Sequence, residues 1–404
     1  MKVRARRFFV AGIAMVLLGT AAACGGDSGG DGDTDEPFKV LFVSGQTGLL
    51  SVPATGVTRG LEAFVEWKNE QGGVKGRPIE LEIKDNQSDP TRGVTLIQEE
   101  INSDDPPDLV VTGISSNEAL AAAPILMRAE VLTMQSAASP LLDDVDKYPY
   151  FFSTALTHEV IYESMLNFIK EENPDVDRVA LVAPQDAIGD ATQEFFDGAF
   201  KDSGIETSEH RFKGDDVDIS PVFQDALSKD PDFIIMEGAG AQVATMVASR
   251  VKAGAESVPT IIGSSASSQP ILEIANEAQR ENLFNTLAPG EAWIEPEDRG
   301  EIFGTFVDLI KAQGELESPI SVYQSGWDVL YVWTRAVESI DGEITSAAVR
   351  EALENLPDYE EPLMPAYGGG GGYSAESHFH PGKADDFTFG RIIEKRDGMS
   401  ILDD

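Results

Sequence analysis

Few side chains in this sequence could carry out catalysis. The chain contains one cysteine, Cys24, and four histidines, of which His378 and His380 would place two rings on the same side of a strand. Such a pair could bind zinc with a third ligand, but no further ligand is spaced to join it, so we interpret the segment as a solvated loop. No predicted strand-to-helix turn carries the G-x-S-x-G motif of serine hydrolases, and the Walker A motif is absent. We therefore predict no catalytic residues, no bound metal and no cofactor.

One glycine-rich turn matches a dinucleotide-binding loop only in part. Residues 238–243 (GAGAQV) follow a predicted strand and open a predicted helix. Val243 replaces the third glycine of the G-x-G-x-x-G pattern, and residues 260–262 (TII) occupy the stretch where an acid is expected. We interpret this turn as a place where the backbone comes close to a ligand, rather than as a nucleotide site.

Small hydroxyl and glycine residues recur after several predicted strands, each time just before a helix. The four segments are residues 44–48, 113–117, 135–139 and 263–267. Ligands of open α/β sheets bind outside the carboxyl ends of the strands. Free N–H groups at helix N-termini, together with serine hydroxyls, make a neutral site for a small anion such as a carboxylate. Because no acid–base residues accompany these segments, they indicate binding without reaction.

Alternating strands and helices must position these segments. Apolar runs predict strands at residues 39–43, 79–83, 109–111, 131–134, 151–155, 178–183, 205–212, 232–236, 258–262 and 387–393. Helical periodicity predicts helices at residues 56–69, from 90 to 101, and at 117–128, 158–171, 191–202, 221–228, 241–253, 297–312, 323–339 and 345–353. This alternation predicts parallel sheets in α/β layers. The pattern restarts near residue 155, which predicts two lobes.

The charge excludes one large class of partners. The 404 residues include 30 Lys and Arg against 70 Asp and Glu, for a formal net charge of -40. Nucleic-acid binding depends on a basic face that releases counterions from the phosphate backbone. We therefore expect no nucleic-acid partner, and we interpret the acid excess as a source of solubility.

The first residues predict export. Lys2, Arg4, Arg6 and Arg7 precede an apolar run at residues 8–20, which as a helix would reach only about 20 Å and is too short to span a membrane. Three alanines then precede Cys24, an arrangement that resembles a bacterial lipobox, although Ala21 stands where leucine is usual. We predict a signal peptide at 1–23, a lipid on Cys24, and a flexible acidic linker over 24–37.

From residue 38 to 404 the chain resembles the type I solute-binding proteins of bacterial ABC importers, the group of the leucine/isoleucine/valine-binding protein. The marks of the resemblance are residues 43–48 (VSGQTG), 69–77 (NEQGGVKGR), 83–90 (IKDNQSDP), 113–116 (GISS), 136–139 (SAAS) and 186–190 (DAIGD). The resemblance implies the periplasmic-binding-protein type I fold, with two lobes joined by a three-stranded hinge. Each lobe is then a parallel sheet flanked by helices. We assign 38–155 plus 287–363 to lobe 1, and 156–286 plus 364–404 to lobe 2.

The resemblance also implies positions for a ligand site in the first lobe. Ser115 falls where the amino-acid binders hold the substrate carboxylate with a serine hydroxyl, and Ser116 and Asn117 follow it. A second loop offers backbone and hydroxyl contacts. Its residues are Ala137, Ala138 and Ser139.

In the second lobe several family residues are replaced. Ile188 and Ala239 stand where the family has tyrosines, and Ser265 or its neighbours replace the acid that pairs with the substrate ammonium. Either Glu237 or Glu291 substitutes for that acid, or the solute lacks an amino group, because a buried ammonium without an anionic partner is costly.

Two aromatic residues are further candidates for contact with the solute. Trp293 and Tyr323 would form an aromatic wall for a hydrophobic or ring-bearing solute, or they are core residues of a helix or hinge.

We therefore expect a protein that is not an enzyme but the lipid-anchored, extracytoplasmic solute-binding component of an ABC importer. It would act as a monomer, capture branched-chain amino acids or related small carboxylates and amides, and deliver them to a membrane permease. One alternative is a sensory receptor without transport. Another is an extracellular hydrolase or zinc enzyme, which needs His378 and His380 or a serine–base pair to assemble in the cleft.

Overall fold

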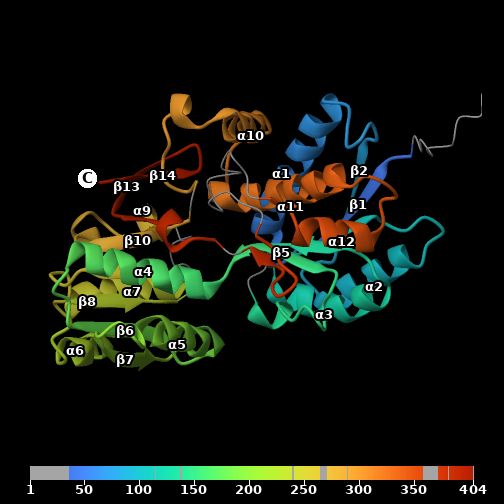
Figure 1. The fold of residues 1–404 in the computed structure, drawn as a ribbon. Helices are drawn as coiled ribbons and strands as arrows, with labels where there is room; N and C mark the ends of the chain where they lie inside the picture. Colours follow the sequence, from blue (N-terminus) through green and yellow to red (C-terminus); the bar gives the residue numbers. More distant parts are fainter. Residues whose placement is uncertain are drawn as a thin grey trace, which may run out of the picture. The chain divides into compact units, whose positions relative to one another are not determined.

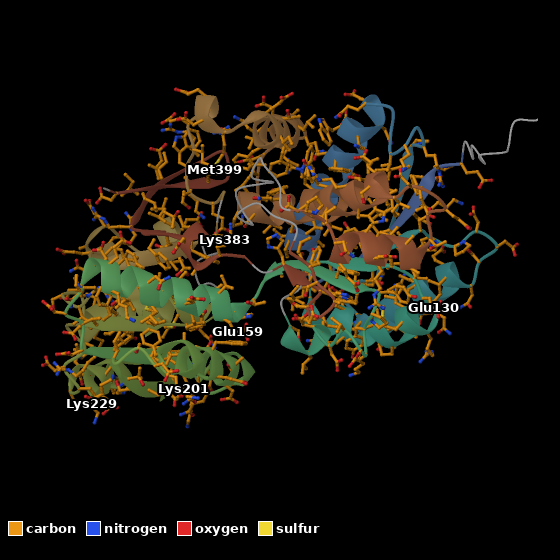
Figure 2. All side chains as sticks on the ribbon, viewed as in Figure 1. Glu130, Glu159, Lys201, Lys229, Lys383 and Met399 are labelled. Atoms are coloured by element: carbon orange, nitrogen blue, oxygen red, sulfur yellow. The ribbon has the colours of Figure 1, made fainter. Side chains whose placement is uncertain are left out.

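The computed structural model describes residues 36–403, except for 114, 137–138, 239–240, 264–270, 289, 358–371 and 381. The predicted signal peptide, Cys24 and most of the predicted linker lie outside the described residues. Charged side chains such as Glu130, Glu159 and Lys201 point into solvent (Figure 2). In the described part of the chain, no helix is both long and apolar enough to cross a membrane.

The first sheet has six parallel strands in the order β11-β5-β4-β3-β1-β2. Its strands are β1 (Phe38–Ser44), β2 (Ile79–Asp85), β3 (Leu109–Thr112), β4 (Thr133–Gln135), β5 (Phe151–Leu156) and β11 (Phe379–His380). The inner strands are buried on both faces, as expected for apolar runs in a parallel sheet. Because all six strands run the same way, their carboxyl ends lie along one edge.

Helices cover both faces of this sheet (Figure 1). On one face lie α1 (Ser51–Glu70), α10 (Glu301–Ala312), α11 (Ile320–Ser339) and α12 (Ser346–Glu354). On the other face lie α2 (Pro90–Ile101) and α3 (Ser116–Arg128). The helices α1 and α11 pack backbone against backbone at two glycines: a Cβ on Gly60 would lie 1.8 Å from the carbonyl oxygen of Tyr323, and one on Gly326 would lie 2.2 Å from that of Val57.

The second sheet also has six strands, in the order β12-β10-β9-β8-β6-β7. They are β6 (Arg178–Pro184), β7 (Glu206–Phe212), β8 (Phe233–Met236), β9 (Thr260–Ile262), β10 (Leu283–Leu287) and the antiparallel β12 (Thr388–Gly390). One face carries α4 (His158–Glu172) and α5 (Ala187–Phe200). The other carries α6 (Ser220–Leu227), α7 (Ala241–Lys252) and α9 (Ile271–Ile274). A short hairpin follows, formed by β13 (Ile392–Arg396) and β14 (Met399–Leu402).

The predicted α/β class with two mainly parallel sheets is confirmed. The strands β10, β11 and β14 were not expected, and the single strand predicted at 387–393 is divided between β12 and β13. The chain passes between the sheets three times, after β5, after β10 and after β11. The assignment of all of 364–404 to lobe 2 needs correction, because β11 pairs with β5 of the first sheet. The remaining lobe boundaries and the hinge stay predictions.

The solvated loop predicted around His378 and His380 is wrong. Both side chains are buried. The His378 ring stacks on Phe152 at 3.9 Å between centroids, and its Nε2 lies 3.0 Å from a carboxylate oxygen of Glu354. Among the described residues no group of three His, Cys, Asp or Glu side chains could hold a metal ion. The histidine pair therefore packs the segment around β11 against the core of the first sheet.

Asp328 is a buried acid inside α11. It is 3% exposed, and neither carboxylate oxygen has a hydrogen-bond partner among the described residues. Burial raises the pKa of this carboxyl group well above its usual value. The folded protein therefore holds a proton on Asp328 that the unfolded chain releases near pH 4, and this contribution to stability is lost as the pH rises from there toward the folded-state pKa.

We predict that Asp328→Asn removes this pH dependence. The free energy of unfolding of the variant, measured by urea denaturation from pH 4 to pH 8, should rise relative to that of the wild type by up to about 1.4 kcal/mol per pH unit. The exposed Asp308→Asn on α10 serves as the control and should follow the wild type. Parallel profiles for Asp328→Asn and the wild type would contradict the prediction.

Candidate functional site

The start of α3 brings three of the predicted ligand residues together at the carboxyl edge of the first sheet. Ser115 is the N-cap of α3, and its Oγ accepts a hydrogen bond from the backbone N–H of Asn117 at 3.3 Å. Ser116 is the first helical residue and half-buried, whereas Asn117 is exposed. The first turn of a helix presents N–H groups and a partial positive charge, so this position suits a carboxylate.

Glu118, in the same turn, was not among the predicted site residues. It is 5% exposed, and one carboxylate oxygen accepts a hydrogen bond from the side-chain amide of Asn86 at 2.5 Å. The spacing Ser115-x-x-Glu118 matches a capping box, in which the glutamate would bond back to the N-cap N–H. Here the carboxylate instead reaches across to the loop after β2. The capping-box pattern is the only feature of the sequence that singles out Glu118, and this pattern predicts the start of a helix rather than a ligand-binding residue.

The neighbouring loops are fixed by their own hydrogen bonds. Thr47 donates from its hydroxyl to Asp85 at 2.6 Å and from its backbone N–H to the other carboxylate oxygen at 3.1 Å. Burial raises the pKa of Asp85, but the hydrogen bonds from Thr47 and from the N–H of Gln87 outweigh it, so the net pKa is lowered. Asp85 therefore stays ionised and holds the β1–α1 loop against β2.

In the second sheet, the candidate acid Glu237 follows β8 at the carboxyl edge and is 2% exposed. The hydroxyl of Tyr162 on α4 donates to its Oε2 at 3.3 Å. Burial, and then the charge of Glu237, raise the pKa of Tyr162 well above its usual value, so this hydroxyl remains a donor. The carboxylate lies directly against Gly263, where a Cβ would come within 1.7 Å of Oε2.

The other candidate acid, Glu291, has a structural role. It is half-buried, and burial raises the pKa of its carboxyl group although Ser321 and a backbone N–H donate to it. The Ser321 hydroxyl binds one carboxylate oxygen at 2.5 Å, and the N–H of Ala288 binds the other at 3.0 Å. Its backbone carbonyl accepts from the N–H of Ser400 at 2.7 Å. Glu291 therefore ties the crossing segment after β10 to α11 and β14.

Trp293 and Tyr323, the two candidates for an aromatic wall, lie in different surroundings. Tyr323 is 1% exposed inside the α1–α11 core, and its hydroxyl accepts hydrogen bonds from the backbone N–H groups of Glu317 and Ser318. The guanidinium carbons of Arg299 and Arg396 lie 4.7 and 4.8 Å from the Trp293 ring centroid. Tyr323 therefore packs in the core, the alternative left open by the sequence, whereas a ligand-binding role of Trp293 stays a prediction.

The remaining predicted site residues lie on several different segments. Ser139 is half-buried, and its carbonyl accepts from the N–H of Leu142 at 3.0 Å. Ile188 lies in the first turn of α5. Ala137, Ala138, Ala239 and Ser265 lie outside the described residues. Their ligand-binding roles stay predictions.

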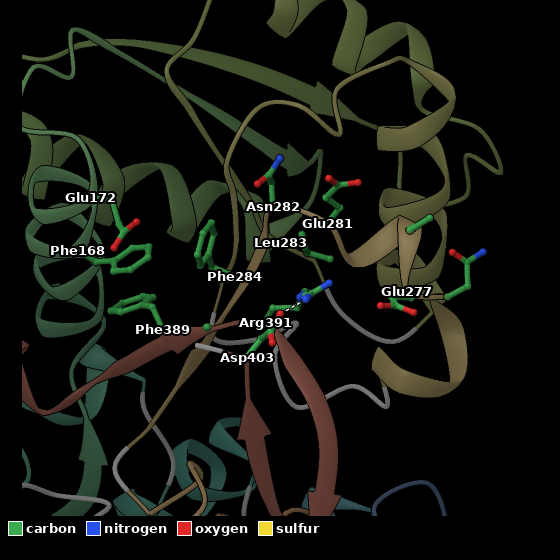
Figure 3. A pocket seen from close by; sticks show the side chains of 13 residues that line it. Phe168, Glu172, Glu277, Glu281, Asn282, Leu283, Phe284, Phe389, Arg391 and Asp403 are labelled. Carbon is green, nitrogen blue, oxygen red and sulfur yellow. Dashed lines mark ion pairs between the residues drawn. The ribbon is translucent and has the colours of Figure 1, made fainter.

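A cavity of about 1020 Å³ lies elsewhere, at the opposite edge of the second sheet (Figure 3). Phe168 stacks on Phe389 at 4.5 Å between centroids, and Phe284 closes the aromatic side. Because Phe284 stands near the amino end of β10, this cavity lies away from the carboxyl edge of the second sheet, where Glu237 follows β8.

Comparison with known proteins identifies the family. The model of the periplasmic binding protein family matches residues 37–382. The chain belongs to the periplasmic binding protein family. No curated protein matches this periplasmic binding protein. The family consists of substrate-binding proteins rather than enzymes, and membership suggests an extracytoplasmic location.

Solved structures share the fold of this periplasmic binding protein. An ABC transporter substrate-binding protein from Sphaerobacter thermophilus is 23% identical with a TM-score of 0.72, covering 91% of this chain and 97% of that one. A solute-binding protein from R. palustris in complex with 4-hydroxybenzoate is 18% identical (TM-score 0.69; 91% and 96% covered). A branched-chain amino acid transporter substrate-binding protein from Streptococcus pneumoniae, in complex with isoleucine, is 18% identical (TM-score 0.63; 90% and 98% covered). These TM-scores show that the chain has the two-lobed type I fold.

We predict that Gly263→Ala destabilises the protein by roughly 1–3 kcal/mol, because the added Cβ displaces the Glu237 carboxylate from the Tyr162 hydroxyl. Thermal or urea unfolding measures the change. Gly198→Ala in α5 is the matched control: a Cβ there meets nothing within 4 Å, and alanine favours a helix by up to about 1 kcal/mol. Equal stabilities for the two variants would show that the carboxylate does not hold this position.

Proposed function

We propose that this protein is the solute-binding component of an ABC importer, and that its solute is a small carboxylate such as a branched-chain amino acid. The observation that carries the proposal is the N-terminus of α3, capped by Ser115 at the carboxyl edge of the first sheet. The solute carboxylate accepts hydrogen bonds from the Ser115 hydroxyl and from N–H groups of the first turn. No bond of the solute is broken.

The chemistry of the neighbours' ligands supports a carboxylate. Isoleucine and 4-hydroxybenzoate, found with two proteins of the same fold, differ in their side groups but share a carboxylate. A helix N-terminus recognises this common group, whereas the loops around it decide which side group is accepted.

Exposed apolar residues near the same edge support a solute with an apolar body. Leu49 and Leu141 are 93% and 68% exposed, and they lie in the segments that follow β1 and β4. Val217, in the segment after β7 of the second sheet, is 92% exposed. Large apolar side chains held in water at a ligand-binding edge gain free energy when a solute covers them.

The remaining parts of the proposal concern delivery. The second lobe closes over the solute about the three crossing segments, and the closed form delivers it to a membrane permease. Lipidated Cys24, followed by the acidic linker, keeps the monomeric protein at the outer face of the membrane.

We predict that Ser115→Ala weakens binding of the solute by roughly 1–3 kcal/mol, because it removes a buried hydroxyl contact. A thermal-shift screen with L-leucine, L-isoleucine, 4-hydroxybenzoate and 4-methylpentanoate identifies a binder first, and calorimetric titration then compares the variants. A bound solute at 100 times its Kd stabilises the fold by about 2.7 kcal/mol.

Thr345→Ala is the matched control, because Thr345 is also an N-cap, accepting from the N–H of Ala348 on α12. Each substitution costs about 1 kcal/mol of stability through the lost cap, but only Ser115→Ala should change affinity. Unchanged affinity in Ser115→Ala removes this hydroxyl from the site, and failure of every carboxylate to bind refutes the proposed solute class.

A further inference from the structure

The cavity at the amino edge of the second sheet is lined by aromatic rings and by carboxylates (Figure 3). Its volume of about 1020 Å³ suits a small organic molecule. The lining residues come from the end of α4, from residues 276–284, and from residues 389–391 and 403. The second sheet and its surroundings therefore form the cavity without any residue of the first sheet.

Three phenylalanine rings form one wall of the cavity. Phe168 and Phe389 stack with their ring planes 16° apart, and Phe284 meets the edge of Phe168 with centroids 5.2 Å apart. All three side chains are half-buried, so part of each ring stays accessible from the cavity. The face of an aromatic ring is the negative side of its quadrupole, and it attracts a cation as well as an apolar group.

The charged side chains of the lining are mostly acidic. Arg391 is the single cation, and it forms an ion pair with Asp403, drawn as a dashed line in Figure 3. The three other acids of the lining are exposed, and none of them is in an ion pair within the described part of the chain. These acids are Glu172, Glu277 and Glu281. The cavity thus carries three negative charges without a counter-ion from the protein.

Glu172 stands where a negative charge is unfavourable unless a cation lies nearby. It is the last residue of α4, and the helix dipole already places partial negative charge at this end. Lys170 of the same turn makes no ion pair with any described residue. Glu172 also follows Phe168 by four residues, a spacing that puts two side chains on one helix face, and Figure 3 shows the two together. A cation resting on the Phe168 ring would therefore meet this carboxylate.

We propose that this cavity binds an amphipathic organic cation, a molecule with a protonated amine on an apolar body. The body covers the accessible parts of Phe168 and Phe389, which gain free energy when water is removed from them. The ammonium lies against a ring face and the carboxylate of Glu172. Among the described residues no group of three His, Cys, Asp or Glu side chains could hold a metal ion, which favours an organic cation over a metal.

This site goes beyond the proposed function. The cavity lies at the amino edge of the second sheet, whereas the proposed carboxylate site is at the start of α3 on the first sheet. The two ligands therefore do not compete.

Two probes that differ in charge test the proposal by fluorine NMR titration with the full chain: 4-fluorophenethylamine and the neutral 2-(4-fluorophenyl)ethanol. The wild type should bind the amine about tenfold or more tightly, because both probes can contact the rings but only the amine is attracted to the carboxylates. Glu172→Gln should weaken binding of the amine about threefold and leave binding of the alcohol unchanged.

Two further variants control for charge and for the rings. Glu163→Gln removes the same charge from an exposed position of α4 that does not line the cavity, and it should leave both affinities unchanged. Phe389→Leu removes a stacked ring but keeps an apolar side chain, and it should weaken both probes about threefold. Urea denaturation shows whether Phe389→Leu is folded; if it is not, the two glutamate variants decide.

Equal affinities of the wild type for the amine and the alcohol would overturn the proposal, as would failure of both probes to bind. Equal losses in Glu172→Gln and Glu163→Gln would also overturn it, because they would show only a general attraction of cations to an acidic chain. Amine binding that Glu172→Gln leaves unchanged would mean that the amine binds elsewhere. Each of these results leaves the proposed carboxylate site at Ser115 standing, because that site is tested with carboxylates.

Discussion

The parallel pairing of β1 with both β2 and β3 is the constraint on which the candidate site depends. Parallel strands cannot be joined by tight turns, so the chain returns through a helix after each strand. Every helix that follows a strand of this sheet therefore starts at the same edge. The loop after β1, Asn86 after β2 and the start of α3 after β3 meet there although they are far apart in the sequence.

Buried acids are a second theme of this strongly acidic chain. Most described carboxylates of this protein, whose net charge is -40, lie on the surface, yet three of them are nearly inaccessible. These are Glu118, Glu237 and Asp328. Glu118 and Glu237 occupy equivalent settings in the two sheets, each with its carboxylate against a glycine at a carboxyl edge. Each of these carboxylates packs closely against the backbone and so fixes the position of the loop that contains the glycine. A flexible side chain on the surface could not do this.

Much of the fold could be predicted from periodicity, because apolar runs and amphipathic stretches report burial directly. The strand β10 was missed because Asn285 and Thr286 interrupt its apolar pattern, and their burial depends on partners in neighbouring strands. The histidine at 378 was misinterpreted for the same reason: its partners, Phe152 and Glu354, come from distant segments. The local sequence around a residue does not indicate which distant residues it will contact.

The candidate site was predictable at Ser115, because a helix cap is a local feature. It was not predictable at Glu118, whose local pattern indicates a cap but whose carboxylate bonds to Asn86. For Trp293 and Tyr323 the residue type alone was ambiguous, because an aromatic side chain suits both a ligand-binding wall and a core. Only the contacts of each ring in the structure distinguish these two roles.

The late strands have a consequence for the order of folding. The strand β11 completes one edge of the first sheet, and β12 completes one edge of the second. The first sheet cannot be finished until residue 380 has been synthesised, and the second until residue 390, so most of the chain leaves the ribosome with two open strand edges. Open edges invite pairing with other chains. A protein of this topology therefore benefits from charge repulsion between unfinished molecules, which its acidic composition provides.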